Sequence, residues 1–267
     1  MKKIFFFSIV FIIVSQVFAQ QQVLVKSDLI PGTDTVWVFT PKSYSKNKVD
    51  YPAVVMLHGW SGNYKQWNKL MGAQKYADTY QMIIICPDGF YDCWYLNSPL
   101  KKNSQFVTFF FDKLMPDLFS KYRIDTSKLF ITGLSMGGHG ALNLYFSKPE
   151  FFLSAGSTSG VVDMHDPLLK KFGVPALIGE YGNENWTTFS AYSHVANLKG
   201  KNKKMIVDCG TEDFLYKSNN AFAAQCKELG IDIVYITQPG KHEGKYWRQS
   251  IKAHFDFFKS LINEQKK

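Results

Sequence analysis

The sequence predicts an α/β fold with one mostly parallel central sheet that is covered by helices on both faces. Short apolar runs alternate with stretches of helical period along most of the chain, which is the pattern of strand, crossover helix, strand. The 267 residues, 46% of them hydrophobic, can bury a substantial core, and a single α/β domain of this length is common. We therefore expect one domain over residues 20–267.

The elements follow one another in an order that suits this class. Residues 23–25 and 35–40 flank the turn Pro31-Gly32 and predict an opening antiparallel pair. Residues 51–58 (YPAVVMLH) and 82–86 predict buried strands joined by a helix over 64–80. Further strands are expected at 129–132, 152–157, 205–209 and 231–237, with helices over 106–122, 219–229 and 245–261. Residues 160–186 read as a long irregular region, which is typical of a functional or mobile loop.

Residues 1–19 differ in character from the rest of the chain. Lys2 and Lys3 precede an apolar run over residues 4–14, and Val17-Phe18-Ala19 has the small-residue pattern of a cleavage site. This predicts a cleaved secretory signal peptide and a secreted or periplasmic protein. The run is short for a membrane span and no Cys follows the cleavage site, so no stable membrane anchor is expected.

The charge and the cysteines exclude some classes of protein. The formal net charge is +9, but the lysines are scattered or terminal and no aromatic residues interleave with them, which predicts a solvated surface and no nucleic-acid partner. The four cysteines, Cys86, Cys93, Cys209 and Cys226, permit three disulfide connectivities. Cys86 and Cys209 end apolar runs, and a core of this size needs no staples, which favours buried free thiols.

The most informative stretch is FITGLSMGGHG, residues 130–140. An apolar run stops at Gly133, and residues 141, 142 and 144 resume at helical spacing, so the segment predicts strand, sharp turn, helix with Ser135 at the bend. The pattern Gly133-x-Ser135-x-Gly137 is that of a nucleophile elbow, in which glycines leave room for a strained turn that exposes the serine. The N-terminus of the following helix would favour a developing oxyanion at the same place.

A serine nucleophile needs a base, and in this architecture the chain order is Ser, acid, His. His242 alone follows the last predicted strand directly, in a turn-rich loop, and is the preferred base. His165 in the irregular region remains an alternative. His194 and His254 lie in helical patterns and are interpreted as packing or surface residues.

The acid is expected in the loop after the strand over 205–209, because catalytic groups gather at the carboxyl ends of parallel strands. Three carboxylates lie there, and we rank Asp213 first, Glu212 second and Asp208 third. The oxyanion hole should use the N–H of Met136, directly after the serine, and that of Trp60 in the flexible loop over 58–62. His58 and His139 are given structural rather than catalytic roles.

Several longer motifs resemble the esterase D family of α/β-hydrolases. They are LHGWSGN with a following Trp67, PDG, WYLNSP, GLSMGGHGAL, CGTEDFL and PGKHEGKYW, and they extend over residues 36–261. The resemblance implies the α/β-hydrolase fold, with Ser135 as nucleophile, Asp213 as acid and His242 as base, and with Trp60 and Met136 as oxyanion donors. It also places Trp94 and Tyr95 at the acyl pocket, as substrate contacts.

The resemblance further implies an activity. The family includes S-formylglutathione hydrolases, feruloyl and acetyl xylan esterases, short-chain esterases and mycolyltransferases. S-formylglutathione hydrolases are cytosolic and carry a DTSPRG-like stretch where this chain has PDGFY at 87–91, and Gln105 stands where many relatives have Glu.

We expect a secreted serine carboxylesterase without metal or organic cofactor, acting on acetyl or feruloyl groups of plant polysaccharide. A general short-chain esterase, an envelope acyltransferase and, more remotely, a non-catalytic carbohydrate-binding hydrolase fold are the alternatives.

Overall fold

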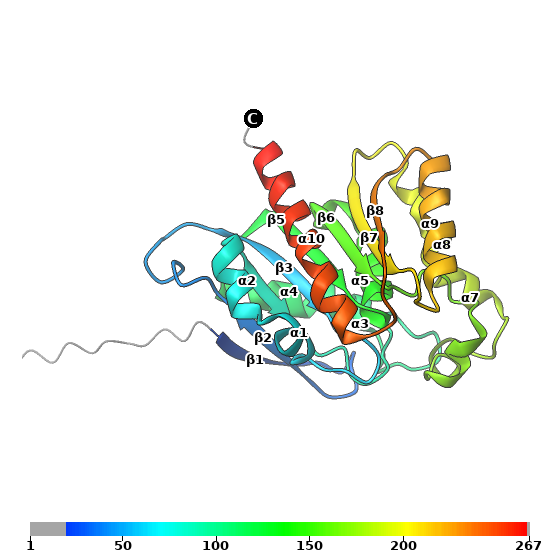
Figure 1. The fold of residues 1–267 in the computed structure, drawn as a ribbon. Helices are drawn as coiled ribbons and strands as arrows, with labels where there is room; N and C mark the ends of the chain where they lie inside the picture. Colours follow the sequence, from blue (N-terminus) through cyan, green and yellow to red (C-terminus); the bar gives the residue numbers. More distant parts are fainter. Residues whose placement is uncertain (1–19, 266–267) are drawn as a thin grey trace, which may run out of the picture.

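The computed structural model describes residues 20–265, and the signal peptide predicted for residues 1–19 lies outside the described part. One eight-stranded sheet has the order β1-β2-β4-β3-β5-β6-β7-β8 (Figure 1). Its strands are β1 (Gln20–Lys26), β2 (Thr33–Phe39), β3 (Tyr51–Leu57), β4 (Ile83–Cys86), β5 (Ile124–Gly133), β6 (Ser154–Thr158), β7 (Lys204–Gly210) and β8 (Asp232–Gln238). β1 and β2 pair antiparallel and the other six strands run parallel, which confirms the predicted α/β class.

Helices cover both faces of the sheet because the central strands are apolar on both sides. Along β3, Val54 and Met56 belong to one hydrophobic core, whereas Val55 and Leu57 belong to the other. The first core contains residues of α1 (Gln66–Met71), α2 (Ala73–Tyr80) and α10 (Gly244–Glu264), and the second contains residues of α5 (Met136–Ser147) and α9 (Tyr216–Glu228). Figure 1 shows α10 crossing the face of β5, β6 and β7 opposite to α5.

Two predicted helices are interrupted. The helix expected over 64–80 is divided into α1 and α2 by Gly72, whose φ of 70° is left-handed and ends the first helix. The helix expected over 106–122 consists of α3 (Phe106–Phe109), a π-helical turn over Phe110–Leu114, and α4 (Met115–Lys121). Pro116 follows that turn and lacks the N–H that a regular helix would use there.

The region over 160–186, expected to be irregular, contains short helices. They are a 3-10 turn over Pro167–Lys171, α6 (Pro175–Ile178) and α7 (Glu184–Thr188), followed by α8 (Ala191–His194) and a 3-10 turn over Val195–Leu198. Asp166 and Asn183 cap two of them by accepting N–H groups of Leu168 and Asn185. We call residues 163–194 the cap segment.

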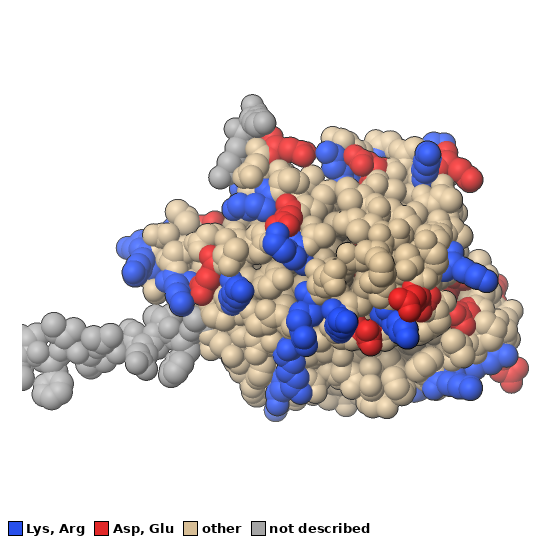
Figure 2. Space-filling view, viewed as in Figure 1, with Lys and Arg blue, Asp and Glu red and all other residues tan. Residues whose placement is uncertain are grey.

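The described surface carries both signs of charge. On the face shown in Figure 2, lysine and arginine side chains are interspersed with acidic ones among many uncharged residues. Within residues 20–265 no helix combines the length and the apolar character that a membrane span requires. All four cysteines are buried and unpaired.

Candidate active site

Ser135 lies at the sharp turn between β5 and α5. Its φ of 53° and ψ of −117° are unfavourable for a side-chain-bearing residue, and its N–H is held by the carbonyl of Thr158 at 3.1 Å. A Cβ at Gly133 would collide with the backbone of Gly137, and a Cβ at Gly137 would collide with that of Leu57. The two glycines of the motif are therefore needed because the elbow packs against itself and against β3.

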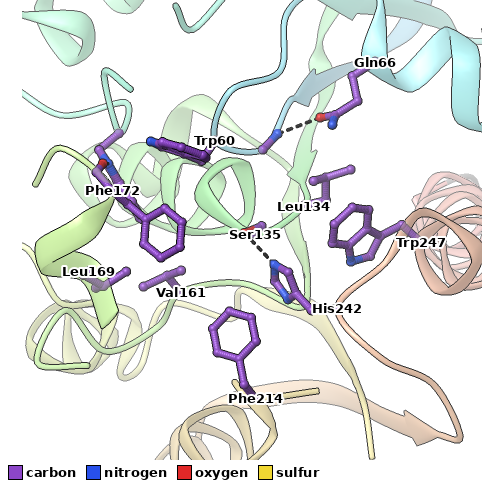
Figure 3. Close-up of a pocket in the computed structure, with 12 residues that line it drawn as sticks. Trp60, Gln66, Leu134, Ser135, Val161, Leu169, Phe172, Phe214, His242 and Trp247 are labelled. Atoms are coloured by element: carbon purple, nitrogen blue, oxygen red, sulfur yellow. Dashed lines mark hydrogen bonds between the residues drawn. The ribbon is translucent and has the colours of Figure 1, made fainter. Parts of the chain in front are cut away.

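Three side chains from different loops form one hydrogen-bonded line. The Ser135 hydroxyl lies 2.9 Å from His242 Nε2, as Figure 3 shows. His242 Nδ1 lies 2.9 and 3.1 Å from the two Asp213 carboxylate oxygens. A neutral imidazole in this arrangement donates Nδ1–H to Asp213 and accepts the serine proton at Nε2. The residues follow the carboxyl ends of β5, β7 and β8, which meet at the same edge of the sheet.

The surroundings hold this line in place. The Asp213 side chain is fully buried and also accepts the N–H of Leu215 at 2.9 Å. The His242 ring lies between the rings of Phe214 and Trp247, at centroid distances of 4.6 and 5.0 Å. Rings on both sides leave the imidazole little freedom to turn away from the serine.

The structure places the alternative acids and bases elsewhere. Glu212 is exposed and lies 3.9 Å from Lys241, while Asp208 is buried and bonds to His254. His165 contacts Asp163 and Thr187 in the cap segment. His194, interpreted from the sequence as a packing or surface residue, bonds to the carbonyl of Thr188. Of the candidates raised from the sequence, only Asp213 and His242 are brought to Ser135.

The loop over 58–62 lies beside the elbow and is tightly held. Gly59 N–H donates to Gln66 Oε1 at 2.8 Å, as Figure 3 shows, and Ser61 N–H donates to the Tyr91 carbonyl at 2.8 Å. The buried ring of His58 bridges the Gly59 carbonyl and the Gly89 N–H, each at 2.8 Å. His58 therefore fixes the loop, in keeping with the structural role expected for it.

Two N–H groups at this place are available to a ligand. Met136 is the first residue of α5, where an N–H has no partner within the helix. In the described chain the N–H groups of Trp60 and Met136 donate to no backbone carbonyl. Trp60, Gly59 and Ser135 line the same pocket. Trp60, in the pocket lining, and Met136, directly after Ser135, are thus both placed next to the serine, as an oxyanion hole would require.

A pocket of about 180 Å³ opens on Ser135 and is mostly apolar. In Figure 3 the side chains of Trp60, Phe172, Leu169 and Val161 form one side of it, and Trp247 and Leu134 lie on the other. Its complete lining consists of Gly59, Trp60, Gln66, Trp94, Leu134, Ser135, Val161, Leu169, Phe172, Phe214, His242 and Trp247. These residues include no Lys, Arg, Asp or Glu, so the pocket suits an uncharged group.

The two aromatic residues expected as substrate contacts are placed differently. Trp94 lines the pocket, and its indole N–H donates to the carbonyl of Phe172 at 2.9 Å, which ties the cap segment to the loop over 90–99. Tyr95 is fully buried outside the lining, where its hydroxyl donates to the carbonyl of His58 at 3.0 Å. Tyr95 supports the loop over 58–62 from behind, and its expected contact with substrate does not fit this position.

Several lining residues were not anticipated from the sequence. Leu169 and Phe172 come from the cap segment, where no periodicity indicates which side chains turn inward. Phe214 and Trp247 follow Asp213 and His242 closely, and their aromatic character next to the proposed acid and base was a usable signal.

One buried histidine next to the site has an altered pKa. His139 lies on α5 against Trp94, and burial lowers its pKa to about 4, an effect that the nearby Val161 backbone only partly opposes. Neither ring nitrogen has a hydrogen-bond partner that meets ordinary geometry among the described residues. His139 is therefore held neutral behind the elbow. No group of three or more His, Cys, Asp or Glu side chains in residues 20–265 is arranged to hold a metal.

An α/β serine hydrolase is the class that this sheet and this side-chain arrangement define, and among such enzymes a carboxylic ester hydrolase. The chain belongs to the esterase family described as "Putative esterase", which matches residues 27–258.

The comparisons with known proteins agree with this class. The chain is 27% identical to an acetyl esterase of Caldicellulosiruptor saccharolyticus over 231 residues, which cover 77% of this chain and 82% of the relative. It is 24% identical to an S-formylglutathione hydrolase of Mus musculus over 236 residues, 79% and 82% of the two chains. The solved structure of a ferulic acid esterase shares the fold with a TM-score of 0.78, at 23% identity, covering 91% of this chain and 98% of that one.

Proposed function

We propose that this protein is an exported serine carboxylesterase that hydrolyses acetyl or feruloyl esters of plant polysaccharide through an acyl-enzyme. The observation that carries the proposal is the unbroken line from Ser135 through His242 to the buried Asp213 at an apolar pocket. Such a line activates a hydroxyl that is otherwise a poor nucleophile.

Each residue of the line has a defined part in the reaction. Ser135 Oγ attacks the ester carbonyl carbon while His242 Nε2 takes its proton, and Asp213 holds Nδ1–H and stabilises the imidazolium. The tetrahedral oxyanion accepts the N–H groups of Trp60 and Met136. His242 then returns the proton to the leaving alcohol. In the second half, water attacks the acyl-enzyme with His242 as base again, which releases the acid and restores Ser135.

The pocket supports the choice of a compact, uncharged acyl group. Its volume of about 180 Å³ lies below the roughly 300–1,000 Å³ of pockets for drug-sized ligands. Aromatic walls from Trp60, Trp94 and Phe172 suit a planar group such as feruloyl, and the small volume also suits acetyl. The similarity to an acetyl esterase and to a ferulic acid esterase adds support for these two acyl groups.

A general short-chain carboxylesterase is the second candidate, and the small pocket favours it as well. The two candidates differ in the alcohol, since a polysaccharide esterase must accept a polymer at the mouth of the site whereas a general esterase prefers small, soluble esters.

Hydrolysis of p-nitrophenyl acetate, methyl ferulate, acetylated xylan and S-formylglutathione, each with wild type and Ser135→Ala, tests the proposal. We expect wild-type hydrolysis of acetylated xylan or methyl ferulate and none by the variant. Activity on p-nitrophenyl acetate alone would favour the general esterase, and preferred cleavage of the thioester would overturn the polysaccharide assignment. If wild type and variant were equally inert on all four, the esterase mechanism itself would fail.

Export is a separate part of the proposal and has its own test. The charged start, the apolar run over 4–14 and the site at Val17-Phe18-Ala19 support cleavage after Ala19. We expect protein expressed in a bacterial host to leave the cytoplasm with Gln20 as its first residue, as read by intact mass. A protein that keeps residues 1–19, or that stays in the cytoplasm, would contradict it.

A further inference from the structure

A second line of acid, imidazole and hydroxyl lies inside the molecule, below the candidate active site. Asp208 Oδ2 is 2.6 Å from His254 Nε2, and His254 Nδ1 is 2.8 Å from Thr132 Oγ1. All three side chains are buried, with exposures of 1%, 0% and 0%. Asp208 belongs to β7, Thr132 to β5, and His254 to α10, which crosses these strands in Figure 1.

This inner line is not a second catalytic site. Thr132 is closed off from solvent, and none of the three residues lines the pocket at Ser135. Gly156 on β6 makes room for the imidazole, because a Cβ there would collide with the His254 ring. The sheet is thus shaped around the pair. The role of Asp208 and His254 therefore depends on the residues that they contact.

The contacts lead to both sides of the nucleophile elbow. On one side, His254 bonds to Thr132, which lies on β5 three residues before Ser135. On the other side, Thr158 Oγ1 donates to Asp208 Oδ1 at 2.7 Å, and the Thr158 carbonyl accepts the N–H of Ser135 at 3.1 Å. Asp208 is also tied to β6 through its backbone, since its carbonyl accepts the N–H of Ser159 at 2.8 Å.

The inner line therefore holds the strand that leads into the elbow and the carbonyl that anchors the serine itself. Ser135 needs such support, because its left-handed backbone is unfavourable and persists only where the surroundings determine it. Both oxygens of Asp208 are bonded, and Ser250 contacts Thr158 Oγ1 at 2.9 Å from α10, so the network is fully satisfied. Loss of one member leaves a buried polar group without its partner.

We propose that Asp208 and His254 are positioning residues that hold the backbone of Ser135 at the angle needed for attack. The inference rests on the proposed role of Ser135 as nucleophile. It assigns a function to two residues that the sequence offers as alternative acid and packing residue, and it makes α10 part of the support of the elbow as well as the element that follows His242.

The experiment uses matched variants of Thr132, because replacing Asp208 or His254 can prevent folding. Thr132→Val keeps the shape and removes the hydroxyl, whereas Thr132→Ser keeps the hydroxyl. Two readouts are measured at a temperature where both variants are folded by circular dichroism. They are kcat and KM for p-nitrophenyl acetate, and the second-order rate of Ser135 labelling by a fluorophosphonate, which needs no knowledge of the natural substrate.

We expect Thr132→Val to lower kcat and the labelling rate by about tenfold with KM changed less than about twofold, and Thr132→Ser to recover most of the loss. His254→Gln retains a side chain that can hydrogen-bond, so its kcat and labelling rate should lie between those of wild type and those of His254→Leu. Equal labelling rates in wild type and Thr132→Val would overturn the proposal, as would losses that match the fraction of unfolded protein. The proposed function has its own, distinguishable outcome. It is contradicted if wild type hydrolyses no ester or if Ser135→Ala keeps the activity.

Discussion

Neighbouring carboxylates acquire different roles from their immediate surroundings. Asp213 is buried and faces His242 at 2.9 Å, whereas Glu212, the adjacent residue, points into solvent near Lys241. A buried carboxylate that bonds to the imidazole N–H fixes the tautomer and stabilises the imidazolium. An exposed carboxylate one residue away does neither. The difference follows from the turn at Gly210, where Asp213 N–H donates to the Gly210 carbonyl and the side chain turns inward.

Asp213→Asn should therefore lower kcat for ester hydrolysis by on the order of 10³- to 10⁴-fold, because an amide can present its N–H to His242 and favour the wrong tautomer. Steady-state kinetics with p-nitrophenyl acetate measures the loss. Glu212→Gln is the matched control and should stay within about twofold of wild type. A large loss of kcat in Glu212→Gln, together with near wild-type kcat in Asp213→Asn, would show that Glu212 is the acid.

At the scale of elements, the cap segment forms one wall of the pocket although it contributes no strand to the sheet. Its Leu169 and Phe172 face Ser135, and it is fastened to the loop over 90–99 by the Trp94 indole and by Ser98 Oγ, which donates to the Leu177 carbonyl at 2.5 Å. Trp94 has a φ of 53°, which is unfavourable for a bulky residue and suggests that its position is imposed by this contact.

Trp94→Phe keeps an aromatic wall and removes the hydrogen bond to the Phe172 carbonyl. We expect the cap wall to loosen and KM for methyl ferulate to rise by about fivefold, the equivalent of about 1 kcal/mol for one hydrogen bond, with a smaller change in kcat. Tyr181→Phe is the control, since it removes a hydrogen bond to the carbonyl of His165 within the cap segment and away from the pocket. If both variants raise KM equally, Trp94 has no special part in holding the wall.

For the whole molecule, the burial of His139 couples folding to pH. Its pKa is about 4 in the folded protein, against an ordinary value near 6.5. Above pH 6.5 the histidine is neutral in both states and contributes no pH dependence. Below pH 6.5 the unfolded chain binds a proton that the folded chain refuses, so stability falls as the pH falls towards 4.

This single group should lower the free energy of unfolding by about 3 kcal/mol between pH 7 and pH 4. Urea unfolding at several pH values measures the slope. His139→Leu should remove about 3 kcal/mol of the loss in unfolding free energy between pH 7 and pH 4. An unchanged slope in His139→Leu would show that other groups cause the acid sensitivity.

Much of the fold follows from local patterns in the sequence. The apolar runs of the parallel strands, the glycines around Ser135 and the helical spacing after it are all short-range features, and backbone sterics act at that range. The meeting of Ser135, Asp213 and His242 can also be expected from the sequence. Each residue follows a predicted parallel strand, and parallel strands bring their carboxyl ends to one edge of the sheet. No comparable sequence pattern predicts where a helix is interrupted, as it is by the π-helical turn at Phe110–Leu114.

Other properties were decided only by the tertiary structure. The sequence by itself determined the α/β class, the elbow at Ser135 and a short set of acids and bases, since these depend on periodicity and chain order. Among the three acids, with Asp213 already ranked first, packing brought only Asp213 to His242; it also turned Tyr95 away from the pocket and brought Phe172 into it. It also joined Asp208 to His254 across 46 residues. Long-range contacts of this kind depend on how strands and helices pack against one another. Local sequence patterns do not determine which distant residues come into contact.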